Sequence, residues 1–504
     1  MVVRSPWPAP EVPETDLTSF VLRHCERLAA QPALIDGPSG RVLSYRGLAS
    51  GVERAAAGLA ARGFGRGDVL ALHLPNLPEF PIALHAGLRA GGVVTAASPL
   101  FTVPELADQL RRARARIVVT VGPLAETART AAAEAGVEQV LELGELLAGG
   151  DGPPPAERPE PDAVALLLPS SGTTGLPKLV ELTHRALVAN LVQTAIPYPM
   201  PEGGRLLGLA PFFHAMGLAC VLHHGLASGA AIVTLARFDM EVMLRAMAEH
   251  RVTHALVSPP LLTALARHPL VDAFDVSALR TLGSGGAPAD AALERTASER
   301  LGCIVGQGYG MTEAGPLIAV APMAEPERIR PGSVGLLVPG TEAQLVEDEL
   351  WLRGPQLMSG YRDDAAATSA TLDHDGWLHT GDLGHIDDDG QVVLTGRLKD
   401  LIKVRGFQVA PAELEAVLTS HPAVADAAVA GVPDERDGER PKAWVVTSGP
   451  LDAEALRAYV DERVAPYKRL AEIEAVDELP RSMTGKLLRR VLLERERTAE
   501  AVSP

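Results

Sequence analysis

Residues 170–178 read SSGTTGLPK, and this stretch predicts both the local fold and a binding site. Its two glycines and four hydroxyl side chains let the backbone approach an anion closely and offer it N–H and O–H donors, and Lys178 adds a cation. The apolar run 163–168 before it predicts a buried strand, and residues 182–187 after it predict the start of a helix. Because a strand, a glycine-rich loop and a helix N-terminus form an anion-binding arrangement, we expect a phosphate site here.

The spacing of this loop differs from that of the nucleotide P-loop. A P-loop needs Gly, four residues and then Gly-Lys-Ser/Thr, whereas two residues separate Gly175 from Lys178 and Leu179 follows. A kinase or P-loop ATPase is therefore disfavoured. A flexible surface loop is the plain alternative, since Gly, Ser, Thr and Pro are also turn residues. Such a loop would not require an apolar strand directly before it.

Composition limits the class of protein. A chain of 504 residues exceeds one hydrophobic core, so we expect at least two domains. The net charge of −17 argues against a nucleic-acid partner, which requires a basic surface. Three widely separated cysteines, Cys25, Cys220 and Cys303, provide neither a disulfide framework nor a Cys-x-x-Cys metal site, which fits a reducing cytoplasm.

Neither a signal peptide nor an integral membrane segment is expected. The first eight residues lack the apolar core of a signal peptide. Residues 206–236 carry no charge over a length that could cross a bilayer, but Pro211, three histidines and several glycines interrupt them. We expect a buried helix followed by a strand at 230–235.

The pattern along the chain predicts the α/β class. After a hairpin at 33–45, strands such as 69–72 and 93–97 alternate with helices to about residue 145, which implies a parallel sheet covered on both faces. More α/β structure follows residue 170, including a strand at 281–288 that ends in a tight turn. Short alternating strands at 342–353 indicate a small β unit.

The last part of the chain predicts a separate domain. After Arg397 the helices 411–418 and 452–464 alternate with strands 425–432, 442–446 and 472–476, which is a compact α+β pattern of about a hundred residues. We therefore expect a large N-terminal domain of parallel α/β subdomains with a small β unit, residues 1–398, and a small α+β C-terminal domain, residues 399–504.

Five further motifs follow in order along the chain. They are PFFH at 211–214, GQGYGMTE at 306–313, WLHTGD at 377–382, GRLKD at 396–400 and PRSMTGK at 480–486. Together with residues 170–178 they resemble the adenylate-forming superfamily of acyl-CoA synthetases, carrier-loading adenylation domains and luciferases, and within it the 4-coumarate:CoA ligases and related acyl-CoA ligases. The resemblance covers almost the whole chain.

The resemblance implies an AMP-forming carboxylic acid:CoA ligase that uses ATP, Mg²⁺ and CoA. A carboxylate is a poor acyl donor because hydroxide is a poor leaving group, and joining it to AMP supplies a better one that a thiol can displace. Two anions must first be brought together, which requires cations and oriented dipoles where charge develops.

The resemblance assigns roles to nucleotide-binding residues. Thr173, Thr174 and Lys178 would hold the β- and γ-phosphates, and Glu313 with Thr173 would hold Mg²⁺, for which a carboxylate is suited. Tyr309 would lie against the adenine, and Asp382 would accept both ribose hydroxyls. The full expected set is Ser170, Ser171, Gly172, Thr174, Gly175, Lys178, Gly285, Gly286, Ala287, Gln307, Gly308, Tyr309, Gly310, Met311, Thr312, Asp382 and Arg397.

Lys486 is the catalytic lysine by the same resemblance, neutralising the charge between the carboxylate and the α-phosphate. Because it belongs to the small domain, that domain must close for the first step, and the family then rotates it to admit CoA. Lys399 matches the pivot, and Lys403 and Gly406 would lie near the pantetheine tunnel. Leu179, where a glycine often stands, departs from the family pattern.

The acyl pocket is expected to be uncharged. Adenylation domains for amino acids usually place an aspartate near 214–216, whereas residues 211–235 contain neither Asp nor Glu. A cinnamate-like aryl acid or a medium-chain acid fits better than 4-coumarate, because plant coumarate ligases often carry a tyrosine near Met216. His214 would gate the pocket, although a lone histidine on an apolar helix is ordinarily a core residue. The expected lining is His214, Ala215, Met216, Gly283, Gly306, Gly308, Met311, Gly315 and Pro316.

Two other functions remain as alternatives. A stand-alone adenylation enzyme would pass the acyl group to an acyl carrier protein, but no carrier or thioesterase domain is fused to the chain. An inactive nucleotide or acyl-CoA sensor would be expected to lose Lys486 or Glu313, and both are present.

Overall fold

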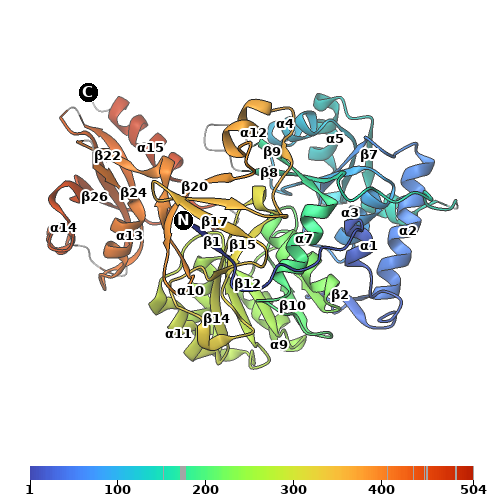
Figure 1. Cartoon of the computed structure of the whole chain (residues 1–504), viewed down its shortest axis with the longest axis horizontal. Coiled ribbons are helices and arrows are strands. Elements are labelled where there is room, and N and C mark those ends of the chain that lie inside the picture. The colour runs from blue at the N-terminus through green and yellow to red at the C-terminus, as the bar shows by residue number, and fades with distance from the viewer. Residues whose placement is uncertain are drawn as a thin grey trace.

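The computed structural model describes residues 1–502 apart from 151, 171–177, 406, 435, 448, 450, 451, 483 and 484, and the side chains of 497–502 are left out. It confirms the expected α/β class, with two large sheets in the N-terminal part and a smaller α+β unit at the C-terminal end. Figure 1 shows this smaller unit, orange to red, at one end of the long axis.

The first large sheet has seven strands in the order β19-β9-β8-β5-β4-β6-β7. The run from β8 to β7 is parallel, whereas β9 and β19 are antiparallel additions. Its strands are β4 (Val69–His73), β5 (Val93–Ala97), β6 (Ala115–Thr120), β7 (Gln139–Glu142), β8 (Val164–Ser170), β9 (Lys178–Thr183) and β19 (Gly360–Tyr361).

The second large sheet has nine strands in the order β16-β15-β14-β13-β12-β10-β11-β2-β3, parallel from β14 to β2. The strands β2 and β3 form the expected antiparallel hairpin. The bounds are β2 (Pro32–Asp36), β3 (Val42–Ser44), β10 (Arg205–Gly208), β11 (Ala231–Thr234), β12 (His254–Val257), β13 (Thr281–Ser284), β14 (Ile304–Gly310), β15 (Leu317–Val320) and β16 (Leu336–Leu337).

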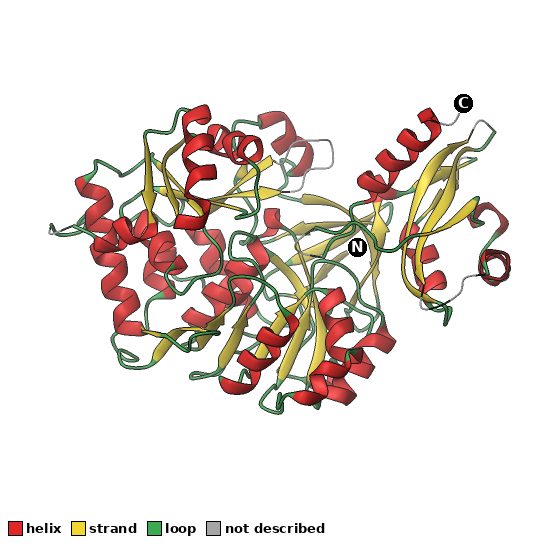
Figure 2. Cartoon of the chain, turned by 180° about the vertical axis from the view of Figure 1, so that it is seen from behind, coloured by secondary structure: helices red, strands yellow, loops and turns green. Residues whose placement is uncertain are grey.

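Helices cover both sheets on both faces, as continuous apolar strands require. Along β6, Ile117 and Val119 face the central core between the two sheets, whereas Val118 packs under α4 and α5 on the outer face. The outer face of the nine-stranded sheet is covered by α9, α10 and α11. Figure 2 shows these helices around the sheets. The helices of this part are α1 (Leu17–Val21), α2 (Tyr45–Ala61), α3 (Phe80–Arg89), α4 (Val103–Ala113), α5 (Ala125–Ala135), α6 (Leu143–Ala148), α7 (His184–Thr194), α8 (His224–Ala227), α9 (Met240–Glu249), α10 (Pro259–Arg267), α11 (Ala291–Leu301) and α12 (Ala365–Thr371).

The uncharged segment 206–236 lies inside the large domain. It contains β10, the π-helix η2 (Met216–His223), α8 and β11, so a strand precedes the expected buried helix. The residues of η2 after Met216 are buried. Among the described residues, no helix is long and apolar enough to cross a membrane.

Two smaller sheets complete the fold. The expected β unit is an antiparallel sheet in the order β1-β17-β18-β20-β21, and its last strand leads into the C-terminal unit, where β23-β22-β25-β24 and β26 pack against α13, α14 and α15. The bounds are β1 (Val2–Arg4), β17 (Glu342–Val346), β18 (Glu349–Arg353), β20 (Leu378–Ile386), β21 (Val392–Arg397), β22 (Ile402–Val404), β23 (Phe407–Val409), β24 (Val424–Asp434), β25 (Gly438–Thr447), β26 (Glu472–Ala475), α13 (Pro411–Thr419), α14 (Ala453–Asp461) and α15 (Arg489–Val502).

The local architecture around residues 170–178 differs from the prediction. The stretch does not lead directly into a helix, because β9 intervenes and pairs antiparallel with β8, with Ser170 opposite Lys178. The helix α7 begins only at His184, where Thr183 caps it by accepting a hydrogen bond from the Ala186 N–H. An anion at this hairpin would therefore be held by the loop and its flanking side chains, without the helix N-terminus that we expected.

Candidate active site

The predicted site residues lie where several strands end. Ser170 closes β8, the turn 285–287 follows β13, and Gly308 to Gly310 close β14. The ends of β13 and β14 are adjacent at one edge of the nine-stranded sheet. The hydrogen bond between Ser170 and Glu313 joins the end of β8, in the seven-stranded sheet, to the segment that follows β14. The predicted residues Ser171, Gly172, Thr173, Thr174 and Gly175, and also Gly406, lie outside the described residues.

Glu313 is placed at the phosphate-loop hairpin although 143 residues separate it from Ser170. It lies on a short 3-10 helix, Thr312–Ala314, and its side chain is buried. The Ser170 hydroxyl donates to Glu313 Oε1 at 2.6 Å, and the Tyr361 hydroxyl donates to the same oxygen at 2.8 Å. The Lys178 ammonium lies 4.8 Å from the centroid of the Tyr361 ring. A carboxylate and a cation thus stand at the two ends of the hairpin.

Asp382 and Arg397 form the second polar part of the site. They are directly opposed on the antiparallel strands β20 and β21, which explains why residues 15 apart in sequence meet. Arg397 Nε lies 2.7 Å from Asp382 Oδ1, and the Tyr309 hydroxyl donates to Asp382 Oδ2 at 2.6 Å. Burial raises the pKa of Asp382, while the charge of Arg397 acts in the opposite direction.

Two glycines of this region are required by close backbone approach. A Cβ at Gly310 would lie 2.3 Å from the Pro316 carbonyl oxygen, so only glycine fits beside the 310–316 turn that holds Glu313. Gly286 has a φ of +88°, in the left-handed region that glycine tolerates. Gly285 and Gly308 lie side by side, because a Cβ at Gly285 would be 3.4 Å from the Gly308 carbonyl oxygen.

The side chain of Gln307 forms hydrogen bonds within the protein. Its amide accepts from the Ala289 N–H at 2.8 Å and donates to the Ala289 carbonyl at 2.8 Å and to Glu294 at 2.6 Å. Only the backbone of Gln307 can therefore contribute to a nucleotide site. Met311 and Thr312 connect β14 to Glu313, and Met311 packs partly buried against the central core.

Lys486 reaches this site from the C-terminal unit. The pKa of Lys486 is lowered to about 8 by burial and by the charges of Arg397 and Lys399, while Asp382 and Asp400 oppose the shift. The pKa of His214 is lowered to about 4, first by burial and then by the charge of Lys486. The charge of Lys486 therefore acts on both His214 and Asp382.

The turn that carries Lys486 is docked on the large domain. A Cβ at Gly485 would lie 2.8 Å from Ser258 Cβ, at the connection between β12 and α10. Within the small unit the Arg481 guanidinium donates to the Gly485 carbonyl at 2.9 Å and pairs with Asp426 at 2.8 Å. The lysine is thus held by its own turn and by contact with the opposite domain.

Ion pairs flank the segment 398–400 that connects the two units. Asp382 pairs with Arg397 on the side of the large domain, and Arg489 pairs with Asp400 at 3.2 Å on the other. Lys399 lies exposed between these pairs. Lys403 is exposed on β22. Arg405 forms an ion pair with Asp437, with 2.6 Å between Nε and Oδ1.

Three glycines of the predicted acyl pocket, Gly283, Gly306 and Gly308, lie on the adjacent strands β13 and β14. Gly283 and Gly306 are partners in the parallel register, and Gly285 and Gly308 follow them toward the site. A Cβ built at each of these glycines would have only apolar side chains or backbone atoms as its nearest described neighbours. Those side chains are Leu256 beside Gly283, Met216 beside Gly285, Ala321 and Met323 beside Gly306, and Leu317 and Val320 beside Gly308.

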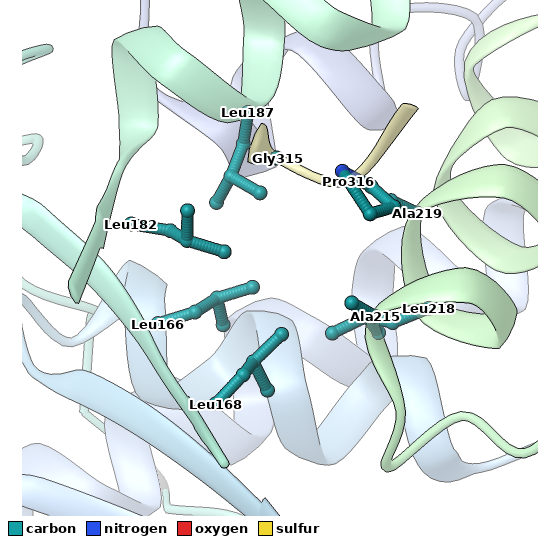
Figure 3. A pocket seen from close by; sticks show the side chains of 9 residues that line it. All are labelled: Leu166, Leu168, Leu182, Leu187, Ala215, Leu218, Ala219, Gly315 and Pro316. Carbon is teal, nitrogen blue, oxygen red and sulfur yellow. The ribbon is translucent and has the colours of Figure 1, made fainter. Parts of the chain in front are cut away.

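Three predicted pocket residues face elsewhere. Ala215, Gly315 and Pro316 line a narrow apolar pocket that has no room for a water molecule, shown in Figure 3. The other lining residues are Leu166, Leu168, Leu182, Leu187, Leu218 and Ala219. Met216 lies instead beside Gly285. The residues predicted to line one pocket therefore lie in two places: Ala215 with Gly315 and Pro316, and Met216 with Gly285.

The leucine at position 179, where a glycine often stands in the family, is explained by strand β9, which the sequence did not predict. On β9 it is buried and packs with Val69, Ala113 and Leu167, and its carbonyl accepts from the Arg362 N–H at 2.8 Å. The apolar side chain thus anchors the second arm of the hairpin to the seven-stranded sheet.

Two polar residues beside the site gave no local signal in the sequence. Tyr361 joins Glu313 to Lys178, as described above. Asn76, just after β4, donates to the carbonyls of Gly208 and Ala210 at 2.9 Å each and accepts from the Phe212 N–H at 2.9 Å. These bonds fix the backbone that leads to His214. A single asparagine in a loop carries no pattern that would have identified this role.

The chain is similar to known proteins over its whole length. A family model described as "AMP-binding enzyme" matches residues 21–362, and one described as "AMP-binding enzyme C-terminal domain" matches residues 413–486. 4-Coumarate–CoA ligase 3 of Oryza sativa subsp. japonica is 37% identical over 524 residues, covering 98% of this chain and 94% of the rice protein.

Solved structures agree with this similarity. ATP-bound MatB from Rhodopseudomonas palustris is 28% identical and superposes with a TM-score of 0.88, covering 96% of this chain and 99% of MatB. The anthranilate CoA ligase AuaEII in complex with anthranoyl-AMP is 26% identical with a TM-score of 0.87, covering 98% of this chain and 99% of that one.

Proposed function

Because the chain belongs to the AMP-binding enzyme family and is an ATP-dependent acid–CoA ligase that works through an acyl-AMP, we propose that it activates an uncharged aryl or medium-chain carboxylic acid. The observation that carries this proposal is that the fold brings Glu313 to the base of the phosphate-loop hairpin and places Lys486 within range of the charge of Asp382. The glycines of β13 and β14, packed against apolar side chains, form the wall at which we propose the acyl slot.

Two displacements make up the reaction. A carboxylate oxygen of the acid attacks the α-phosphorus of ATP, the bond to the β-phosphate bridging oxygen breaks, and pyrophosphate leaves. The thiolate of CoA then attacks the acyl carbon and AMP leaves with the bonding electron pair. In the first step, Lys486 would neutralise charge that develops between the two anions, and Lys178 would hold the departing pyrophosphate.

The polar residues have distinct roles in this proposal. Asp382 would accept the ribose hydroxyls, held in place by Arg397 and the Tyr309 hydroxyl. The ring of Tyr309 would face the adenine on one side, and the backbone of 285–287 would face it on the other. His214, neutral because of its low pKa, would stand at the entrance to the acyl slot without adding a charge there.

A magnesium ion would fit at Glu313. The Glu313 carboxylate is buried beside the phosphate-loop hairpin, and within the described part of the chain both of its hydrogen bonds end on Oε1. Its other oxygen is a hard donor of the kind that Mg²⁺ prefers. When bound, the ion would reduce the charge of the β- and γ-phosphates.

We also propose Lys399 as the pivot between residues 1–398 and 399–504. The ion pairs of Arg397 and Asp400 would keep each side rigid and leave the rotation to the residue between them. In the rotated position Lys403 would approach the large domain, where CoA enters.

The apolar slot supports the substrate class. The glycine positions of β13 and β14 pack against Met216, Leu256, Ala321 and Met323, and the nearest described atoms around these positions include no charged group. A charged acid tail would lose hydration there without compensation. A planar aryl acid or an unbranched chain avoids this cost.

An ATP–pyrophosphate exchange panel over aliphatic, benzoic, cinnamic and amino acids tests the proposal. We expect exchange with cinnamate-like or medium-chain acids, and none with amino acids. Lys486→Ala should abolish exchange while ATP binding, measured by calorimetry, is largely kept. Repeating the reaction with CoA and with an acyl carrier protein compares the two acceptors.

If none of the acids in the panel supports pyrophosphate exchange, the enzymatic function is contradicted. A preference for amino acids or dicarboxylates would contradict the apolar slot alone, and normal pyrophosphate release by Lys486→Ala would contradict the role of that lysine.

A further inference from the structure

Tyr361 is the residue that connects the two charged ends of the phosphate-loop hairpin. Its hydroxyl donates to Glu313 Oε1 at 2.8 Å, and its ring centroid lies 4.8 Å from Lys178 Nζ. The side chain is 9% exposed, so both contacts are made away from bulk water. Hydrogen bonds to a charged group and cation–π contacts both gain strength in such surroundings.

The backbone holds Tyr361 firmly in this position. Strand β19 pairs antiparallel with β9, with Tyr361 opposite Val180 and Gly360 opposite Glu181. The Tyr361 N–H also donates to Thr368 Oγ1 at 2.9 Å, on the helix that follows. The ring is therefore attached to the same hairpin arm that carries Lys178.

A second donor reaches the carboxylate oxygen that the Tyr361 hydroxyl contacts. Ser170 donates to the same carboxylate oxygen at 2.6 Å. With Oε1 occupied by these two donors, the orientation of the carboxylate is defined and Oε2 is directed away from them.

We propose that Tyr361 is a positioning residue that orients the Glu313 carboxylate toward a divalent cation and holds the Lys178 ammonium beside the phosphates. The inference rests on the proposed function of this site. Groups that hydrogen-bond to a metal-binding carboxylate typically contribute a factor of about 10–100 to metal affinity.

Two substitutions separate the two contacts. Tyr361→Phe removes the hydroxyl and keeps the ring beneath Lys178, so it should weaken cation binding and leave metal-free ATP binding almost unchanged. Tyr361→Leu removes both contacts and should weaken both. The matched control is Tyr45→Phe, because Tyr45 is also buried and donates to the Ala230 carbonyl at 2.7 Å, far from this hairpin in the fold.

The experiment measures Mn²⁺ binding to the full-length enzyme by electron paramagnetic resonance, with ATP present and without any carboxylic acid. We expect Tyr361→Phe to weaken Mn²⁺ binding about tenfold and to raise the Mg²⁺ concentration for half-maximal pyrophosphate exchange by a similar factor. ATP affinity in the presence of EDTA should change less than about twofold in Tyr361→Phe and fall about fivefold or more in Tyr361→Leu.

The outcomes distinguish this inference from the function on which it rests. If wild-type enzyme exchanges pyrophosphate and a folded Tyr361→Phe variant binds Mn²⁺ like wild type and like Tyr45→Phe, the positioning role is wrong. If none of the acids supports pyrophosphate exchange by the wild-type enzyme, the proposed function itself is wrong, whatever the variants show. An equal loss of cation binding in Tyr45→Phe would show a general effect of the substitution and would also overturn the inference.

Discussion

Lys486 shows how single residues acquire their properties from the fold. An isolated lysine stays charged to about pH 10.4. Here burial and the nearby charges of Arg397 and Lys399 lower its pKa to about 8. The charges of Asp382 and Asp400 oppose this shift, so the electrostatic cost of placing the lysine is only partly offset by its neighbours.

The lowered pKa predicts an alkaline limit of the first step. Because the protonated lysine is the active form, kcat/KM for pyrophosphate exchange should fall about tenfold per pH unit above pH 8. Bound ATP adds negative charge beside Lys486 and raises its pKa, so the fall in kcat should begin at higher pH. Residual activity of Lys486→Arg should lack this limb, because arginine stays charged. An unchanged profile in that variant would assign the limb to another group.

At the scale of elements, hairpins and strand ends bring distant residues together. Asp382 and Arg397 face each other across β20 and β21, and Ser170 faces Lys178 across β8 and β9. Asn76 connects the two large sheets, because its side chain, just after β4, donates hydrogen bonds to the backbone at the end of β10 and after it. The position of His214 therefore depends on the distance between the two large sheets.

This arrangement predicts a selective effect of Asn76→Ala. The substitution leaves the buried carbonyls of Gly208 and Ala210 and the Phe212 N–H without their partner, which loosens the wall of the acyl slot. We expect KM for the carboxylic acid to rise about tenfold while KM for ATP changes less than about twofold. Steady-state kinetics with each substrate varied in turn measures this.

Gln109→Ala provides the control for Asn76→Ala. Gln109 is a buried amide that donates to Thr95 Oγ1 and the Ala96 carbonyl at 3.0 Å each, on the side of the sheet covered by α4. Its loss should lower stability without changing KM for the acid. Similar KM changes in both variants would show that the effect of Asn76 is only structural.

At the scale of the whole molecule, the position of the small unit decides which step can proceed. The contact between Gly485 and Ser258 holds the turn of Lys486 against the large domain, and the charge of Asp382 acts on this lysine, as the proposed acyl-AMP formation requires. CoA attack would use a rotated arrangement in which this contact is broken.

The docked contact predicts that Gly485→Ala separates the two half-reactions. The new methyl group would meet Ser258 Cβ at 2.8 Å, at a backbone φ of +81° that already favours glycine. We expect pyrophosphate exchange to slow more than about tenfold, whereas thioester formation from synthetic acyl-AMP stays within about threefold of wild type. Gly449→Ala is the control, because nothing lies within 4 Å of its Cβ position. Equal losses in both half-reactions would contradict the role of the contact.

Buried histidines predict that the large domain loses stability in acid. Burial lowers the pKa of His184, His224 and His254 to about 4 each, that of His85 to about 3, and that of His223 well below its ordinary value. The unfolded chain binds protons near pH 6.5 and the folded chain does not. Stability is therefore complete above pH 6.5 and falls as pH drops toward 4, by about 1.4 kcal/mol per pH unit for each histidine.

His223→Leu tests this sign. Within the described residues neither ring nitrogen of His223 has a hydrogen-bond partner, so an apolar side chain of similar size should be tolerated at pH 7.5. The loss of unfolding free energy between pH 7.5 and 5.5, measured by urea denaturation, should be smaller by about 1.4 kcal/mol. His374→Leu, with an exposed histidine, should match wild type. A steeper loss in His223→Leu would contradict the prediction.

The sequence by itself determined the α/β class, the positions of most strands and helices and the family of the enzyme. Apolar runs with period 2, helical stripes and turn residues are local signals, and six motifs in a fixed order carry the chemistry. Lys178, Glu313, Asp382 and Lys486 were identified in this way because their neighbours form recognisable patterns. Their roles in the site remain predictions for the experiments above.

Only the tertiary structure decided how these residues meet. Strand β9 separates the loop from the helix that the sequence predicts after it, because the register of β9 with β8 buries Leu179 in the seven-stranded sheet. No local pattern shows this interaction. Tyr361 meets Glu313 across 48 residues and Asn76 meets Ala210 across 134, and no motif surrounds either of them. Local sequence sets the backbone preferences of each element, whereas contacts between distant residues depend on how whole sheets pack. This packing placed Ser170 against the Glu313 carboxylate and Lys178 against the Tyr361 ring.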